Sequence, residues 1–312
     1  MKIVCDAHIP FLVEAVQKEW PEAHISPLKP EEITARTVRD ADVLIVRTRT
    51  RVNAHLLFGS NVKLVCTATI GYDHIDTDFC DSQGIRWTAC PGCNAQAVSD
   101  YIAEALNELS AVSRQSSVIG IVGVGHVGSL VAQMAAHRGM KVLLNDPPKG
   151  IGVSLEEIAR ECDIITFHTP LDVSTYHLCN EAFLSQCKSS ALIINAARGG
   201  VVDEQALLRS GHPYILDTWE NEPAICPDVL QNAFRASMHI AGYSLEGKRM
   251  ATQMCLDVVA HTFGLNPIVL SSEVASKLLV GDSGPGWLER ISNKLKAHPE
   301  QFEMLRKEYI LR

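Results

Sequence analysis

Three polar residues follow short apolar runs in the second half of the chain. Arg198 comes after "LIIN", Glu222 comes shortly after "YIL", and His239 comes after "SM". An arginine binds a carboxylate through two parallel hydrogen bonds and keeps its charge at physiological pH. A histidine accepts a proton from a hydroxyl group, and a nearby carboxylate fixes the imidazole tautomer. Together the three suit hydride transfer from an alcohol carbon that lies next to a carboxylate.

Each residue also has an ordinary structural interpretation. A single histidine at a strand end is commonly held by a backbone carbonyl. Glu220, two residues before Glu222, is the second choice for the acid, and His168, after "ITF", is the alternative proton acceptor. In open α/β sheets, however, ligands bind beyond the carboxyl ends of the strands. Because these side chains all follow expected strands, we favour the catalytic interpretation.

The stretch "IGIVGVGHVGSL" contains a G-x-G-x-x-G motif between an expected strand and an expected helix. Such a turn lets the backbone approach a pyrophosphate, and the helix N-terminus offers N–H groups to the phosphates. Asp146 ends the next expected strand, where a carboxylate accepts hydrogen bonds from the adenosine ribose and repels a 2′-phosphate. We therefore expect NAD as the cofactor. The contacts expected from the turn are Gly123, Gly125, His126, Val127 and Gly128.

These residues need strands and helices to position them. The runs "ADVLIVRT" and "VKLVCTAT" are continuously apolar, as strands buried on both faces of a parallel sheet are. A long helical run from Asn94 to Ser113, with Asn94 as its N-cap, precedes a second series of strands. The pattern predicts an α/β fold with two doubly wound parallel-sheet domains and a short C-terminal helical extension. We expect a flavodoxin-like substrate domain at residues 1–93 and 243–265 and a Rossmann-type NAD domain at 94–242.

Composition narrows the kinds of protein. The 312 residues carry a formal net charge of -8, which argues against bulk binding to nucleic acid or to an anionic membrane. The chain has no run of 18 apolar residues, and its start, "MKIVCDAHIP", is not a secretory signal. The ten cysteines are scattered, so we expect reduced thiols in a cytoplasmic protein without a metal site. Cys90 and Cys93 form a lone C-x-x-C, which we interpret as a structural loop.

Arginines alternate in "VRTRTRV", where they occupy positions 47, 49 and 51. In an extended strand they would point to one face. The segment is then either a solvated edge or a cradle for an anion such as phosphate. We favour Arg47 as the residue on the substrate side, and Lys248 is a weaker candidate.

Several stretches occur in a known order: "GIVGVGHVG", "FHTPL", "INAARGGVVDEQAL", "DTWENEP" and "HIAGYSLEGK". In this order they resemble the D-isomer-specific 2-hydroxyacid dehydrogenases. The stretches "TATIGYDHID" and "CPGCNAQAV" resemble, more narrowly, members that oxidise 4-phospho-D-erythronate during pyridoxal 5′-phosphate synthesis. The resemblance implies an NAD-dependent dehydrogenase with a small phosphorylated hydroxy acid as substrate, and it implies a homodimer.

The resemblance also implies residue roles. It assigns catalysis to Arg198, Glu222 and His239. Its NAD contacts fall on Asp146, Thr169, Ala196, Ala197, Arg198, Asp217 and Gly242. Its substrate contacts fall on Thr48, Thr69 and Tyr243, to which the charge pattern adds Arg47.

The C-terminal segment, residues 266–312, departs from the family pattern, which usually includes a longer dimerisation domain. We expect a shortened module whose apolar positions face either a partner or the chain's own core. Two other functions stay open. The chain could act on another 2-hydroxy acid, such as 3-phosphoglycerate, or it could be a non-enzymatic NAD-sensing corepressor or scaffold.

Overall fold

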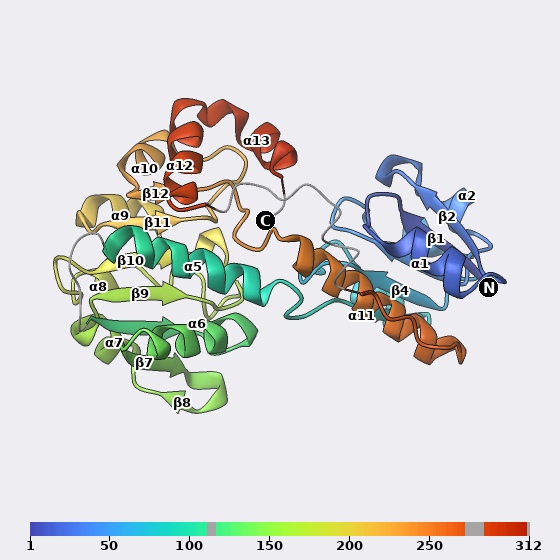
Figure 1. Ribbon diagram of the computed structural model, residues 1–312, viewed down its shortest axis with the longest axis horizontal. Helices are drawn as coiled ribbons and strands as arrows, with labels where there is room; N and C mark the ends of the chain where they lie inside the picture. Colours follow the sequence, from blue (N-terminus) through green and yellow to red (C-terminus); the bar gives the residue numbers. More distant parts are fainter. Residues whose placement is uncertain (111–116, 272–283, 311–312) are drawn as a thin grey trace. The chain divides into compact units, whose positions relative to one another are not determined.

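The computed structural model describes residues 1–110, 117–271 and 284–310. The chain forms two compact units. One comprises Met1–Asn94 and Ser244–Leu279, and the other comprises Ala95–Tyr243 and Val280–Arg312. Each unit is built around its own sheet (Figure 1).

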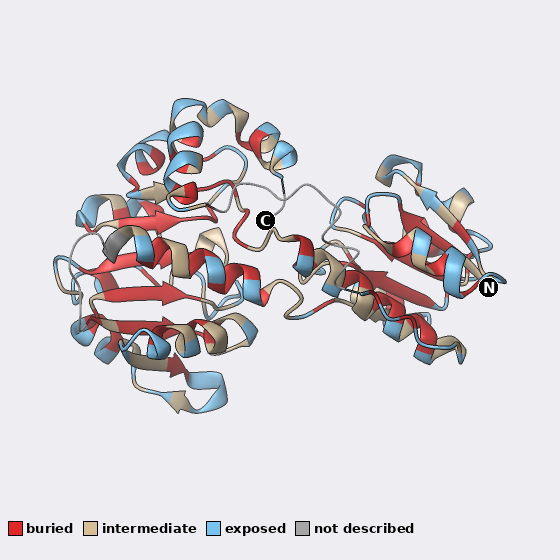
Figure 2. Ribbon diagram, in the orientation of Figure 1, coloured by how far each residue is buried: buried red, intermediate tan, exposed pale blue. Residues whose placement is uncertain are grey.

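The first unit contains a five-stranded sheet in the order β2-β1-β3-β4-β5, with every pair parallel. This order is the flavodoxin-like one. Its strands are β1 (Lys2–Asp6), β2 (His24–Leu28), β3 (Val43–Val46), β4 (Leu64–Thr67) and β5 (Arg86–Thr88). Its helices are η1 (Pro30–Glu32), α1 (Leu12–Glu19), α2 (Ala35–Val38), α3 (Ala54–Leu57), α4 (Thr77–Ser82) and α11 (Leu245–Phe263). All four residues of β3 and of β4 are buried, as their continuous apolar runs predict (Figure 2).

The second unit contains a seven-stranded sheet in the order β12-β11-β10-β9-β6-β7-β8. Its strands are β6 (Val118–Val122), β7 (Lys141–Asp146), β8 (Ile151–Gly152), β9 (Ile164–Phe167), β10 (Leu192–Asn195), β11 (Tyr214–Leu216) and β12 (Arg235–Ala236). Neighbouring strands are parallel except for the short edge strand β8, which runs antiparallel to β7. The chain reverses its direction across the sheet at β6, which lies between β7 and β9. That reversal is the point where a doubly wound sheet binds a dinucleotide.

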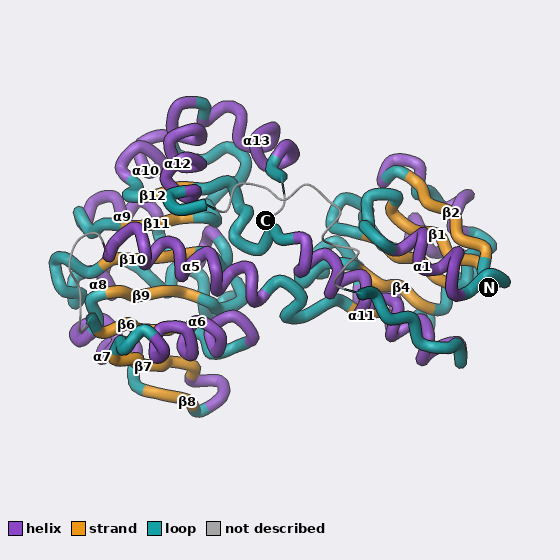
Figure 3. Tube along the Cα trace, viewed as in Figure 1, coloured by secondary structure: helices purple, strands orange, loops and turns teal. Residues whose placement is uncertain are grey.

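Helices cover both faces of this sheet (Figure 3). They are α5 (Ala95–Ser110), α6 (His126–His137), η2 (Pro147–Lys149), α7 (Leu155–Glu161), α8 (Glu181–Leu184), η3 (Gly199–Val201), α9 (Glu204–Ser210), α10 (Pro227–Asn232), α12 (Trp287–Ala297), η5 (Pro299–Gln301) and α13 (Phe302–Glu308). Helices α5 and α6 pack against each other on one face. The predicted fold class, two doubly wound α/β sheets with a C-terminal helical extension, is confirmed.

The C-terminal helices complete the core of the second unit. Trp287 and Leu288 of α12, with Phe302 and Leu305 of α13, are buried in the same cluster as the central strands β6, β9, β10 and β11. The Ser292 hydroxyl also accepts a hydrogen bond from the backbone N–H of β12, at 3.0 Å. Of the two environments expected for these apolar side chains, the structure therefore shows the chain's own core.

Two local expectations are wrong. The Asn94 side-chain oxygen is buried without a hydrogen-bond partner, so Asn94 does not cap α5, which begins at Ala95. Positions 47 to 50 form a turn after β3 instead of continuing the strand, with the Thr50 N–H donating to the Arg47 carbonyl at 3.2 Å. The three arginines therefore do not share one strand face. The last residues of the predicted long helix, 111–113, lie outside the described part of the chain.

Candidate active site and cofactor site

The glycine turn connects β6 to α6, and its three glycines meet different demands. Gly123 has a φ of 90°, and a Cβ there would lie 2.8 Å from the His168 carbonyl. A Cβ on Gly128 would lie 2.0 Å from the Gly123 carbonyl oxygen. Beside Gly125 a Cβ would meet nothing within 4 Å. The turn is therefore tightly packed at Gly123 and Gly128 and open at Gly125, where a phosphate can approach the backbone.

The first turn of α6 contains His126 and Val127 and faces this open space. Gly125 is its N-cap residue, and no side chain caps the helix. Its first N–H groups are therefore available to an anion, and the helix dipole favours negative charge there.

Asp146 lies at the carboxyl end of β7, next to the turn. Its Oδ2 accepts the Val124 N–H at 2.8 Å and lies 3.3 Å from Lys149 Nζ. Its Oδ1 makes no hydrogen bond to any described residue, so it can accept one from a ribose hydroxyl. Lys149, which is not among the residues expected from the sequence, also donates to the Val124 carbonyl at 2.7 Å.

Two buried hydroxyl groups near this edge lack partners. The Thr169 hydroxyl, next to the tightly packed Gly123, has none within the described residues. The same holds for the hydroxyl of Thr218, which follows β11. Buried hydroxyls ordinarily form hydrogen bonds. These unsatisfied groups, the open Gly125 and the uncapped helix together fit a bound dinucleotide.

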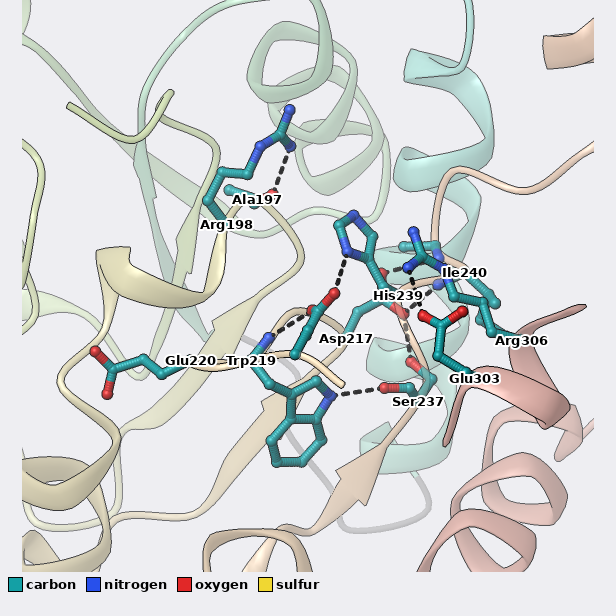
Figure 4. A network of polar contacts seen from close by, with 12 residues as sticks. Ala197, Arg198, Asp217, Trp219, Glu220, Ser237, His239, Ile240, Glu303 and Arg306 are labelled. Carbon is teal, nitrogen blue, oxygen red and sulfur yellow. Dashed lines mark hydrogen bonds and ion pairs between the residues drawn. The ribbon is translucent and has the colours of Figure 1, made fainter. Parts of the chain in front are cut away.

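The catalytic candidates Glu222 and His239 form a close pair. Figure 4 shows the surroundings of the His239 ring. His239 Nδ1 lies 2.9 Å from Glu222 Oε2, while Glu222 Oε1 accepts the Trp219 N–H at 2.9 Å. Burial acts to raise the pKa of Glu222, but the hydrogen bond and charge of His239 hold it below its ordinary value. Glu222 is therefore a carboxylate at neutral pH. The His239 side chain keeps 31% of its surface exposed, so the ring remains accessible.

Asp217 positions the segment that carries His239. Its Oδ1 accepts the Ser237 hydroxyl at 2.6 Å and the Ile240 N–H at 2.8 Å, and its Oδ2 accepts the Ala241 N–H at 2.9 Å. The His239 N–H donates to the Asp217 carbonyl at 2.8 Å, and His239 adopts a left-handed φ of 58°. The predicted cofactor contact Asp217 thus uses its carboxylate to fix the backbone around the histidine, just before Gly242.

Glu220 belongs to a different group of side chains. Its Oε1 lies 2.6 Å from His177 Nε2, and its N–H donates to Glu204 Oε1 at 2.6 Å. Figure 4 shows its carboxylate pointing away from the His239 ring. Burial, and secondarily the charges of neighbouring carboxylates, raises the pKa of Glu204 to about 7. The geometry thus pairs His239 with Glu222 and leaves Glu220 to His177.

Arg198 follows β10 after Ala196 and Ala197. Asn195 fixes this turn, because its Nδ2 donates to the Arg198 carbonyl at 2.8 Å and its Oδ1 accepts the Ala197 N–H at 3.0 Å. The Arg198 Nη1 donates to the Ala197 carbonyl at 2.8 Å. No carboxylate of the described residues pairs with it, so its charge is available to a ligand.

His168, the alternative proton acceptor, is half-buried next to the glycine turn. Its Nε2 lies 3.1 Å from the Thr166 hydroxyl, and burial lowers the pKa of His168 to about 3. The ring is therefore neutral and a poor proton acceptor at physiological pH.

Helix α13 also brings Arg306 to this site, a residue that is not among the candidates expected from the sequence. Its Nε donates to the Tyr243 hydroxyl at 3.2 Å, and its guanidinium carbon lies 5.9 Å from the centre of the Tyr243 ring. Its charge also contributes to the lowered pKa of Glu222. The stretch "FEMLRKEYILR", which contains Arg306, resembles the end of the family's sequences, although the segment before it departs from the family pattern. That resemblance is the signal that could have identified Arg306.

The remaining candidates lie in the five-stranded unit. Thr48 and Thr69 follow the neighbouring parallel strands β3 and β4. The Thr69 hydroxyl donates to the Gly71 carbonyl at 2.9 Å and lies 2.6 Å from the Thr67 hydroxyl. Arg47 pairs with the fully buried Asp6, with Nε at 2.8 Å from Oδ2. This ion pair balances the Arg47 charge within the protein.

The other chemical expectations concern metals, thiols and membranes. The described residues contain no cluster of three metal-ligating side chains. The ten cysteines are free thiols, and Cys90 donates to the carbonyls of Thr67 and Ala251 inside the core. Among the helices of the described residues, none combines the length and the apolar character that crossing a membrane requires.

The sheet order, the glycine turn and the polar groups at the strand ends define an NAD-binding domain of the 2-hydroxyacid dehydrogenase class. Residues 94–241 match the family model of the D-isomer specific 2-hydroxyacid dehydrogenase NAD binding domain. The NAD-complexed D-isomer specific 2-hydroxyacid dehydrogenase of Lactobacillus delbrueckii superposes with a TM-score of 0.71 at 23% identity, covering 86% of this chain and 100% of that one.

Curated relatives narrow the class. The erythronate-4-phosphate dehydrogenase of Bacteroides thetaiotaomicron is 42% identical over 338 aligned residues, which cover 100% of this chain and 97% of the relative. The enzyme of the same name from Porphyromonas gingivalis is 43% identical, over 85% of this chain and 76% of its own length. The chain belongs to the erythronate-4-phosphate dehydrogenase family, within the D-isomer specific 2-hydroxyacid dehydrogenases.

Proposed function

We propose that this chain oxidises 4-phospho-D-erythronate to 2-oxo-3-hydroxy-4-phosphobutanoate with NAD, as a step of pyridoxal 5′-phosphate synthesis. The observation that carries the proposal is the His239–Glu222 pair, 2.9 Å apart, beyond the strand ends of an NAD-binding sheet. The full-length similarity to erythronate-4-phosphate dehydrogenases supports the choice of substrate.

The three catalytic residues have different roles. Arg198 binds the substrate carboxylate and orients the hydroxyl-bearing carbon. His239 donates its Nδ1–H to Glu222, which leaves the Nε2 lone pair to accept the hydroxyl proton. Glu222 stabilises the imidazolium that forms, since its carboxylate stays ionised. NAD, when bound, accepts the hydride from the same carbon.

The cofactor would be held by the domain that we assign to residues 94–242. Gly123, Gly125, Gly128 and the first turn of α6 would hold its phosphates, and Asp146 would bind its adenosine ribose. Further contacts come from the ends of β9, β10 and β11 and the segment after β12. They are Thr169, the Ala196–Arg198 segment, Asp217 and Gly242.

The domain that we assign to residues 1–93 and 243–265 would contribute further contacts to the substrate. We propose Thr48, Thr69 and Tyr243 as its contacts, and Arg47 remains a candidate although Asp6 already pairs with it. Residues 266–312 form the shortened C-terminal segment. The enzyme acts as a homodimer in the cytoplasm, without nucleic-acid or membrane partners.

Turnover with two phosphorylated acids tests this proposal. The purified protein should form NADH from 4-phospho-D-erythronate with a kcat/KM well above that for 3-phosphoglycerate. A preference for 3-phosphoglycerate would instead indicate the related dehydrogenase. NAD binding without turnover of either acid would indicate a sensor or scaffold.

A further inference from the structure

The half-buried arginines of the described residues fall into two groups. Arg47, Arg235 and Arg249 each have a carboxylate oxygen close by, at 2.8, 2.5 and 2.6 Å respectively. Arg198 and Arg306 lack such a close carboxylate partner. Arg198 has no carboxylate partner among these residues, and Arg306 has only Glu303, at 3.4 Å on its own helix. Charges withdrawn from water are ordinarily paired, so these two arginines have charge available for a ligand.

Both arginines belong to the seven-stranded unit and appear in the close-up of the His239–Glu222 pair. In the view of Figure 4 their guanidinium groups lie on different sides of the His239 ring. Arg198 follows β10, whereas Arg306 comes from α13 near the end of the chain. If the proposed function holds, the substrate also carries two anionic groups, a carboxylate and a phosphate.

The guanidinium group of Arg306 is positioned so that it can bind an anion. Its Nε is fixed by the Tyr243 hydroxyl at 3.2 Å, and its guanidinium lies over the Tyr243 ring. Its Nη2 makes no hydrogen bond to any described residue, and 27% of its side-chain surface stays exposed. A guanidinium held in place at one edge presents the geometry that binds a phosphate through two parallel hydrogen bonds.

The C-terminal helix is a stable support for such a group. Phe302 and Leu305 lie in α13 just before Arg306, and they are only 1% and 2% exposed. Glu303, the weak partner of Arg306, keeps 40% of its side-chain surface exposed and can turn toward solvent when an anion arrives. By contrast, Arg47 would have to leave the fully buried Asp6, which would then keep only its contacts with His8, and this loss is costly.

We propose that Arg306, together with the hydroxyl of Tyr243, forms the subsite that binds the phosphate group of the substrate. This inference rests on the proposed function. Arg198 then binds the carboxylate and Arg306 the phosphate, so that the hydroxyl-bearing carbon is held between them beside His239. The C-terminal segment thus contributes a specificity residue to the site.

The test compares a phosphorylated substrate with its unphosphorylated counterpart. Arg306→Gln removes the charge, and Lys307→Gln, on the exposed neighbour in α13, is the matched control. For 4-phospho-D-erythronate, Arg306→Gln should lower kcat/KM by about 10- to 100-fold, as the loss of charged hydrogen bonds implies. For D-erythronate it should change kcat/KM by less than about threefold, because no phosphate contact is lost. Arg306→Lys should fall between wild type and Arg306→Gln.

Inorganic phosphate provides a second measurement. It should inhibit the wild-type enzyme competitively with the substrate, and Arg306→Gln should raise the inhibition constant by about tenfold or more. Unchanged NAD binding shows that the variant is folded. Equal losses with both substrates, or an unchanged phosphate constant, would show that Arg306 acts only through Glu222 and overturn the proposal. One further outcome would contradict the proposed function alone. In it, the wild-type enzyme does not oxidise 4-phospho-D-erythronate, but it binds inorganic phosphate, and Arg306→Gln abolishes that binding.

Discussion

Glu204 should make the stability of the seven-stranded unit depend on pH near neutrality. Glu204 is the first residue of α9, and its side chain is almost fully buried. Its Oε1 accepts the Glu220 N–H at 2.6 Å. Burial raises its pKa from an ordinary value of 4.5 to about 7, and the charges of Glu220, Glu222 and Asp203 act in the same direction. The hydrogen bond from Glu220 opposes this rise without cancelling it.

The size and sign of the effect follow from these values. Each unit of difference between the pKa values in the folded and unfolded states corresponds to about 1.4 kcal/mol of unfolding free energy. The whole difference therefore contributes about 3 kcal/mol. The folded protein holds this proton more tightly than the unfolded chain. The free energy of unfolding should therefore fall as pH rises from about 4.5 through 7 and then become level. A glutamine keeps an acceptor for the Glu220 N–H but has no proton to lose.

Urea unfolding of Glu204→Gln and wild type at pH 5 and pH 8.5 measures this effect. The free energy of unfolding of the variant, relative to that of wild type, should be about 3 kcal/mol higher at pH 8.5 than at pH 5. Glu181→Gln is the matched control, since Glu181 also begins a helix but has an 82% exposed side chain. If the stability difference between Glu204→Gln and wild type is the same at both pH values, the reasoning about Glu204 is refuted.

Three further predictions concern the cofactor, the carboxylate anchor and the first unit. Asp146→Ser should weaken NAD binding and relax the preference over NADP, as measured by kcat/KM with each cofactor; equal use of both by the wild type would refute the role of Asp146. Arg198→Lys keeps the charge but loses the planar fork, so kcat/KM should fall by about tenfold or more while the NAD dissociation constant stays constant; near-normal turnover would exclude Arg198 as the anchor. Arg47→Gln removes the cation that pairs with the buried Asp6 and should lower the unfolding free energy at pH 7 by about 3 kcal/mol. The hydrogen bonds and charge of Arg47, with those from His8, overcome the effect of burial and lower the pKa of Asp6, so this stabilisation is present above its ordinary value of 3.8 and disappears as pH falls below it. A loss of stability that is the same at pH 7 and pH 3 would contradict the assignment.

Most of the scaffold could be predicted from local pattern. Continuous apolar runs identify strands such as β3 and β4 because both faces of a central parallel strand must be buried. The glycine turn is equally clear, since the close contacts at Gly123 and Gly128 exclude any side chain. The strand ends then locate Arg198, Glu222 and His239, because the carboxyl ends of parallel strands meet at one edge.

Other features depend on tertiary contacts and could not be predicted in this way. The arginines at 47, 49 and 51 alternate as in a strand, but β3 ends at Val46 and Arg47 instead turns to the buried Asp6. Nothing near Arg306 in the sequence indicates that α13 folds back to Tyr243. The choice between Glu220 and Glu222 likewise needs the positions of His177 and His239, which lie far away in the sequence.

The central claim is that His239 accepts the substrate proton beside a bound NAD. The most direct test is the rate of NADH formation from 4-phospho-D-erythronate by His239→Ala, with NAD affinity measured on the same sample. Loss of a general base typically costs ~10²–10⁴-fold, so kcat should fall by that factor while the NAD dissociation constant stays at the wild-type value. A variant that keeps most of its rate and its pH profile would contradict the account and assign the proton to another group.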